Sequence, residues 1–146
     1  MESTFPPEGW QTSVKDGRTQ YLCNPPQCQS TELVLVDDLP IAGLSEKLIR
    51  SGAVKSDTIA KLDRYVAKAR KGTYQAEPAI PVISEDYSGF RHKATLNEDG
   101  NVVFLEGQSI VQGSGGIIVL SFAHDQTIAE QNLNTYLSNT TIKRPQ

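Results

Sequence analysis

The chain has 146 residues, of which 38% are hydrophobic and 21% are charged, and its formal net charge is −3. This length predicts a single domain, residues 1–146, that buries about 70% of the surface exposed by its unfolded chain and needs no disulfide to fold. The 17 acidic and 14 basic residues are well mixed, and without a basic stripe nucleic acid is not expected as a partner. No apolar run approaches the roughly 18 residues that a membrane span requires.

The chain opens with a proline-containing segment that leads into a predicted β-hairpin. Residues 10–14 alternate apolar and polar side chains, which is typical of a strand. Asp16 and Gly17 favour the positive φ angles of a tight hairpin turn, and residues 19–23 are the predicted returning strand. Residues 32–37 are rich in β-branched and apolar side chains and predict a further strand.

The only two cysteines, Cys23 and Cys28, follow the hairpin and are separated by Asn-Pro-Pro-Gln. A disulfide between them is the simplest interpretation, because the prolines stiffen the loop and no metal or redox motif is close. A redox site would normally be a C-x-x-C at the start of a helix. A metal site would need further ligands, and His92 and His124 form no spaced pair. A thiol-redox or metal-binding role of this loop remains the alternative hypothesis.

The cysteine pair also bears on the compartment, since structural disulfides imply an oxidising environment. Residues 1–7 have neither the basic nor the hydrophobic region of a signal peptide. The protein is therefore either cytosolic or the mature form of an exported domain whose signal has been removed. The expected disulfide favours the second interpretation, a periplasmic or secreted protein.

Two helices are predicted in the middle of the chain. The apolar residues of 44–49 have helical spacing, and Gly52 could close a short helix. A longer helix is predicted over residues 57–71, with Ser56 as its N-cap and Gly72 directly after its end. Its apolar stripe comprises Ile59, Leu62, Tyr65, Val66 and Ala69.

The second half of the chain predicts an antiparallel meander followed by a helix. Pro78 and Pro81 are expected to bracket a linker. Short turns that contain glycine join three strand candidates, which are residues 87–96, 102–111 and 117–122. The third is apolar on both faces, which predicts a central strand covered on both sides. Asp125 is the predicted N-cap of the last helix, whose apolar stripe comprises Ala129, Leu133, Tyr136 and Leu137.

The remaining candidates for chemistry have simpler structural interpretations. His92 is predicted to share an outward strand face with Phe90, as a surface or edge histidine without an identifiable carboxylate partner or nucleophile. The glycine-rich segment 113–116 precedes a strand, whereas a phosphate-binding loop precedes a helix. The serines lack the G-x-S-x-G pattern of hydrolases. We therefore expect no catalytic residue, no metal ligand and no cofactor, and the sequence names no ligand-binding residue.

The order of elements predicts an α+β fold, in which an antiparallel sheet carries helices on both faces as an α/β/α sandwich. Residues 6–10 (Pro-Pro-Glu-Gly-Trp) before a first hairpin, the strand 117–122 and the helical residues 129–133 carry a resemblance to a known family. In these features the chain resembles the PsbP-like superfamily. That superfamily includes an extrinsic photosystem II subunit, a Ran-binding nuclear transport factor and several bacterial extracytoplasmic proteins.

The resemblance implies a PsbP-like fold and a non-catalytic accessory or binding role, and it transfers no site residues. The Cys23–Cys28 loop lies outside the family pattern, and residues 39–81 fit it loosely. The sequence therefore predicts a non-enzymatic, extracytoplasmic protein that acts through protein–protein contact. It identifies neither the partner nor the oligomeric state.

Overall fold

The computed structural model describes residues 2–39, 41, 43–68 and 73–144. Within these ranges the helices and strands follow one another as β1 (Glu2–Ser3), β2 (Gln11–Lys15), β3 (Arg18–Cys23), β4 (Glu32–Asp38), α1 (Glu46–Ser51), α2 (Ser56–Ala67), β5 (Thr73–Ala76), β6 (Ile80–Ile83), β7 (Ser88–Glu98), β8 (Asn101–Gln112), β9 (Gly115–Ala123), α3 (Gln126–Ser138) and β10 (Thr140–Thr141). The α+β class with an antiparallel sheet, predicted from the sequence, is confirmed.

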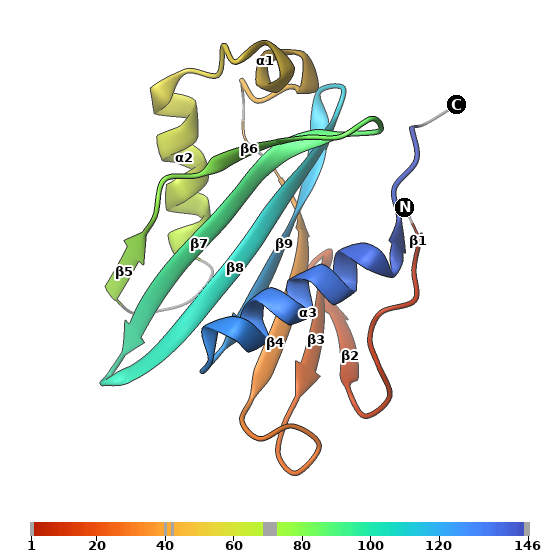
Figure 1. Ribbon diagram of the computed structural model, residues 1–146, viewed down its shortest axis with the longest axis vertical. Coiled ribbons are helices and arrows are strands. Elements are labelled where there is room, and N and C mark those ends of the chain that lie inside the picture. Colours follow the sequence, from red (N-terminus) through yellow and green to blue (C-terminus); the bar gives the residue numbers. More distant parts are fainter. Residues whose placement is uncertain (1, 40, 42, 69–72, 145–146) are drawn as a thin grey trace.

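The main sheet has the strand order β2-β3-β4-β9-β8-β7-β5, and β6 pairs with β7 on the same edge as β5. The long strands β7, β8 and β9 form the predicted meander and run diagonally through the molecule (Figure 1). The short strands β1 and β10 pair separately, which brings the two ends of the described chain together (Figure 1).

Tight turns fix the register of the hairpins. Asp16 and Gly17 both have positive φ, 54° and 78°, as the sequence predicted, and in the structure they place Lys15 opposite Arg18. Asp99 and Gly100 make the same kind of turn between β7 and β8, with φ of 51° and 88°. The meander strands therefore extend further toward this turn than predicted, because only these two residues leave the ladder.

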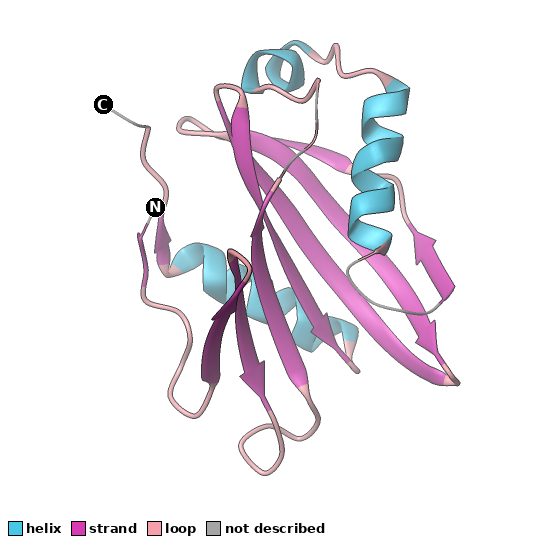
Figure 2. Ribbon diagram, turned by 180° about the vertical axis from the view of Figure 1, so that it is seen from behind, coloured by secondary structure: helices cyan, strands magenta, loops and turns pink. Residues whose placement is uncertain are grey.

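Figures 1 and 2 show the helices from opposite sides of the sheet. Helix α3 crosses in front of the strands in Figure 1 and behind them in Figure 2, and it contacts β8, β9 and β4. Helix α2 lies in front in Figure 2, where α1 covers the end of the sheet near β6 and β7. None of the helices in the described ranges is long and apolar enough to cross a bilayer.

Side chains along the central strands point alternately to the two faces of the sheet and form one apolar cluster on each face. The larger cluster joins Leu62 and Val66 of α2 to β7, β8 and β9 residues such as Leu105 and Phe122. The smaller cluster joins Leu133 of α3 to the opposite sides of β4, β8 and β9. Strand β9 contributes Ile118, Leu120 and Phe122 to the first cluster and Val119 to the second, so the prediction of a central, two-sided strand is confirmed.

Three sequence predictions need correction. The expected linker around Pro81 contains the strand β6, which proline can join because β6 pairs on one side only. Ser56 is the first residue of α2, and the N-cap is Lys55, whose side chain makes no capping bond. His92 shares a face with Phe90, but that face is the covered one, and only 3% of His92 is exposed. The predicted end of α2 at Ala69–Gly72 lies outside the described residues.

Candidate functional site

The cysteine loop connects β3 to β4. The Sγ atoms of Cys23 and Cys28 are 2.05 Å apart, and Cys23 is buried. The backbone N–H of Cys28 donates to the carbonyl of Asn24, and the Thr31 hydroxyl donates to the Asn24 side chain at 2.9 Å. These contacts close the loop on itself. Among the described residues, no group of three or more His, Cys, Asp or Glu side chains is placed to hold a metal ion.

The two histidines lie apart from this loop. His92 is buried in the face that carries the larger cluster, and its Nε2 atom has no hydrogen-bond partner in the described structure. Burial lowers the pKa of His92 to about 4, so the ring is neutral at physiological pH. His124 contacts the carbonyl of Val102 with its Nδ1 at 3.1 Å. In the described part of the chain, no hydrogen bond joins either ring to a hydroxyl or a carboxylate.

A second group of polar side chains lies on the sheet face beneath α3. Glu106 of β8 is 4% exposed and lies opposite Ser121 of the neighbouring strand β9. A carboxylate oxygen of Glu106 lies 3.9 Å from the Arg91 guanidinium. Burial raises the pKa of Glu106, and Glu130 and Glu77 add to this effect, while Arg91 and Lys93 oppose it. Glu106 therefore holds its proton to a higher pH than an exposed glutamate does.

A shallow pocket of about 570 Å³ lies beside the β2–β3 hairpin, lined by Ser13, Lys15, Asp16, Arg18, Gln20 and Asp37. Asp37 accepts hydrogen bonds from Arg18 Nε at 3.1 Å and from the Tyr65 hydroxyl at 2.8 Å. Partial burial alone would raise the pKa of Asp37, but these two partners lower it below its usual range. Asp37 thus links Tyr65 of α2 to Arg18 of the hairpin, and both of its carboxylate oxygens already accept hydrogen bonds.

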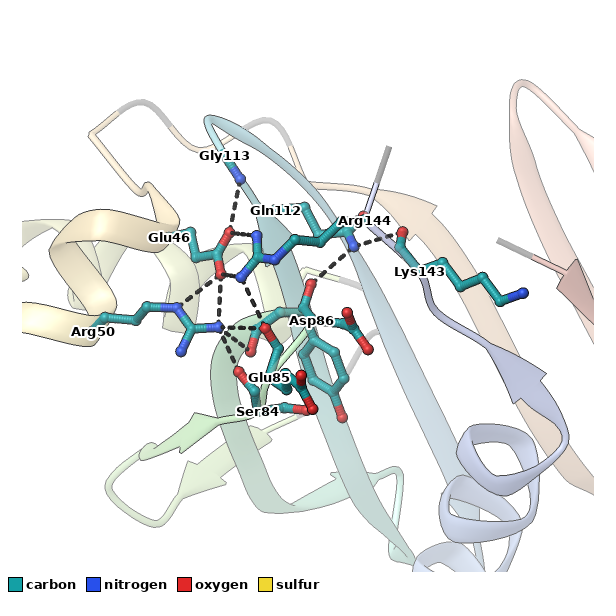
Figure 3. Close-up of polar contacts among 10 residues, drawn as sticks. Glu46, Arg50, Ser84, Glu85, Asp86, Gln112, Gly113, Lys143 and Arg144 are labelled. Carbon is teal, nitrogen blue, oxygen red and sulfur yellow. Dashed lines mark hydrogen bonds and ion pairs between the residues drawn. The ribbon is translucent and has the colours of Figure 1, made fainter. Parts of the chain in front are cut away.

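The most completely built polar site surrounds Glu46, the first residue of α1 (Figure 3). We call Glu46, Arg50, Gly113 and Arg144 the Glu46 cluster. Arg144 binds Glu46 through both guanidinium ends, with Nη1 to Oε1 at 2.8 Å and Nη2 to Oε2 at 2.6 Å. The Gly113 N–H donates to Oε1 at 3.2 Å, and Arg50 Nε donates to Oε2 at 2.8 Å. The side chain of Glu46 is 8% exposed.

Local sequence explains why Glu46 points to this position. Ser45 is the N-cap of α1 and accepts a hydrogen bond from the Leu48 N–H, while Gly52 ends the helix with a φ of 75°. Glu46 and Arg50 are four residues apart and therefore lie on one side of the helix. Arg50 also donates to the carbonyls of Ser84 and Tyr87, which fixes the helix against the β6–β7 loop.

The electrostatics of the cluster keep its carboxylate charged. Hydrogen bonds from Arg144 lower the pKa of Glu46 to about 2, against the opposite effect of burial, with further contributions from Arg50 and the Gly113 N–H. The same interaction raises the pKa of Arg144. An open pocket of about 770 Å³ lies beside these groups, and Lys47 and Ser51 are among its lining residues. The arrangement can hold a cationic group, and in this structure it holds the guanidinium of Arg144.

Sequence reasoning did not single out Glu46, Arg50 or Arg144. The i, i+4 pair of Glu46 and Arg50 after a serine cap was a local signal that could have been found. The third member was not predictable, because Arg144 is 98 residues away from Glu46 and meets it only in the folded chain.

No protein-family model matches the sequence, and a search of curated proteins found no significant match. Solved structures do match. One is a protein of unknown function, PA94 from Pseudomonas aeruginosa, described as a putative regulator, with a TM-score of 0.58 and 9% identity over 97% of this chain and 90% of that one. Another is LpqN, involved in cell envelope biogenesis of Mycobacterium tuberculosis, with a TM-score of 0.58 and 10% identity over 97% of this chain and 82% of that one. At such identities the likeness shows the fold alone.

Proposed function

We propose that this chain is a non-enzymatic accessory protein of an extracytoplasmic compartment and that it acts by binding another protein. The observation that carries the proposal is the Glu46 cluster, because a buried carboxylate there already binds an arginine from a distant segment of the chain, and an open pocket lined by Glu46 and Arg144 lies beside it. The compartment is supported by the pairing distance of Cys23 and Cys28 and by the envelope role stated for LpqN.

We also propose that the fold is a PsbP-like α/β/α sandwich. Support comes from the placement of α3 and α2 in the two views and from the two apolar clusters that each involve a different helix. Superposition of an experimental structure of this protein on a PsbP-like protein tests the assignment. A strand order that differs from the one described above would contradict it.

A site-specific crosslinking experiment tests the binding role. A photo-crosslinking amino acid is placed at Lys47, which lines the pocket beside Glu46. In a control variant it is placed at Asn101, the first residue of β8, whereas the pocket lies next to the last residue of that strand. With the protein exported to the periplasm, we expect a specific protein adduct from position 47 that is absent from position 101. Identical adducts from both positions, or none from either, would contradict the proposal.

Thiol labelling distinguishes this function from the alternative of a redox or metal factor that uses the cysteine loop. We expect no labelling of Cys23 or Cys28 in the native protein without reductant, and complete labelling after reduction and unfolding. The double variant Cys23→Ser/Cys28→Ser should keep its crosslinked partner while losing about 2 kcal/mol of stability. One fast-reacting thiol in the native protein would favour the alternative.

A further inference from the structure

We propose that the Glu46 carboxylate, at the wall of the open pocket, is a receptor site for an arginine side chain, which Arg144 occupies in the free protein and which an arginine-bearing segment of the partner occupies in the complex. This inference rests on the function proposed above and specifies its surface. Arg144 would then act as a reversible latch that keeps the site closed until the partner displaces it.

The geometry of the site is specific for a guanidinium group. Both carboxylate oxygens of Glu46 accept hydrogen bonds from Arg144, which donates through two nitrogens in a bidentate pair. Arg144 Nη2 also donates to the carbonyl of Glu85 at 2.9 Å. A lysine ammonium is a single point of charge and cannot bridge both oxygens with parallel bonds, so the site discriminates between the two cations.

The segment that carries Arg144 is lightly held. The Arg144 side chain is 48% exposed, although the carboxylate it binds is buried. Besides this ion pair and the bond from Arg144 Nη2 to the Glu85 carbonyl, the segment is held by the Gln112 side-chain amide, which donates to the carbonyl of Lys143 at 2.9 Å (Figure 3). The same amide donates to the carbonyl of Asp86 at 3.0 Å. The strand β10 ends at Thr141, so Lys143 and Arg144 can leave the pocket while the pairing of β10 with β1 remains.

The site keeps its shape when Arg144 leaves. Glu46 still accepts from Arg50 and from the Gly113 N–H, and Arg50 still holds the loop carbonyls of Ser84 and Tyr87. A prearranged carboxylate therefore remains at the wall of the pocket, which Arg144 itself also lines in the present structure. Such preorganisation favours binding, because the ligand does not have to order the receptor.

The charges around the pocket also match a cation. Glu85 and Asp86 add negative potential at Arg144, as does Glu46 itself. Arg50 and Lys47 oppose them, but Arg50 is engaged by Glu46 and by backbone carbonyls. Glu46, Glu85 and Asp86, which act electrostatically on the position of Arg144, outnumber the basic pair Lys47 and Arg50, so the vacated position favours the return of one positive charge.

A binding experiment with small analogues tests the receptor. The probes are N-acetyl-argininamide and, as the matched control, N-acetyl-lysinamide, titrated into the Arg144→Ala variant while the backbone amide resonance of Gly113 is followed. We expect saturable binding of the arginine analogue and at least about tenfold weaker binding of the lysine analogue. The wild-type chain should bind the arginine analogue about tenfold more weakly than the Arg144→Ala variant does, because Arg144 competes for Glu46 at an effective concentration in the millimolar range.

Two further variants keep the test decisive. The Arg144→Lys variant retains the positive charge and should still bind the arginine analogue better than wild type does, which covers the case that Arg144→Ala folds poorly. The variant Glu46→Gln/Arg144→Ala should not respond to the analogue. Absence of saturable binding in both Arg144 variants, equal binding of the two analogues, or binding that survives Glu46→Gln would overturn the inference.

Crosslinking from position 47 separates this inference from the function on which it rests. We expect the adduct yield to rise in Arg144→Ala and to fall in Glu46→Gln/Arg144→Ala. If the yield is the same in all variants, the partner binds elsewhere and only the arginine site is wrong. If no variant yields an adduct, the proposed function fails, and the analogue titration alone decides whether Glu46 receives a guanidinium.

Discussion

At Gly89 the backbone of β7 lies so close to that of β8 that an added Cβ atom would be 1.8 Å from the carbonyl oxygen of Ser109. The Ser109 hydroxyl also accepts a hydrogen bond from the Phe90 N–H at 2.9 Å. Because the backbone of Ser109 is paired with Ile118 of β9, its carbonyl group cannot move away without disturbing that ladder. Glycine is therefore required here by space and not by its φ angle.

The substitution Gly89→Ala should lower the free energy of unfolding by about 3 kcal/mol, near the upper end for an overpacked core position. Gly115→Ala is the matched control, since its Cβ would have nothing within 4 Å, and it should change stability by less than about 0.5 kcal/mol. Urea unfolding of both variants measures the difference. Equal effects of the two substitutions would show that the close approach is not rigid.

Single residues also show what sequence alternation can and cannot predict. The prediction that His92 and Phe90 share a face is correct, because side chains alternate along any strand. The expectation that this face is exposed is wrong. The alternation of side chains along a strand assigns residues to two faces but does not show which face is covered. Here α1 and α2 cover the face of His92, and their packing depends on residues far away in the chain.

The start of α3 was predictable because a single side chain makes its cap. Asp125 is the N-cap of α3, as predicted, and its Oδ1 accepts from the Ile128 N–H at 3.1 Å. Helix α2 has no such local determinant, because Lys55 occupies its N-cap without a side-chain bond. Strands β5 and β6 were not predicted, since both are short edge strands without a clear period that pair only with β7, and β6 also contains Pro81.

The two helix caps allow a paired test at the level of elements. Asp125→Ala should lower the free energy of unfolding by about 1 kcal/mol, because the Ile128 N–H loses its acceptor. Lys55→Ala at the N-cap of α2 removes no capping bond and should be nearly neutral. Thermal unfolding compares the variants, and a loss at Lys55 as large as that at Asp125 would contradict the argument.

On the scale of the whole molecule, three buried ionisable groups shape the response of stability to pH. The pKa values of Glu46 and His92 are lowered in the folded state, while that of Glu106 is raised. Glu46 stabilises the fold fully above its unfolded pKa of 4.5, and this contribution is lost as the pH falls through about 2. The contribution of Glu106 has the opposite sign, because it is complete below the unfolded pKa and is lost as the pH rises through the raised value.

His92 dominates between pH 6.5 and 4, because its unfolded pKa is 6.5 and its folded pKa is about 4. Protons therefore bind the unfolded chain first, and stability falls as the pH is lowered through this window by about 3 kcal/mol. The His92→Leu variant should lose this slope, whereas His124→Gln, at an exposed position, should keep it. Urea unfolding at several pH values measures the slopes. Parallel curves for wild type and His92→Leu would mean that the buried ring accepts its proton without cost, and that the face beneath α1 and α2 opens to water more readily than its packing indicates.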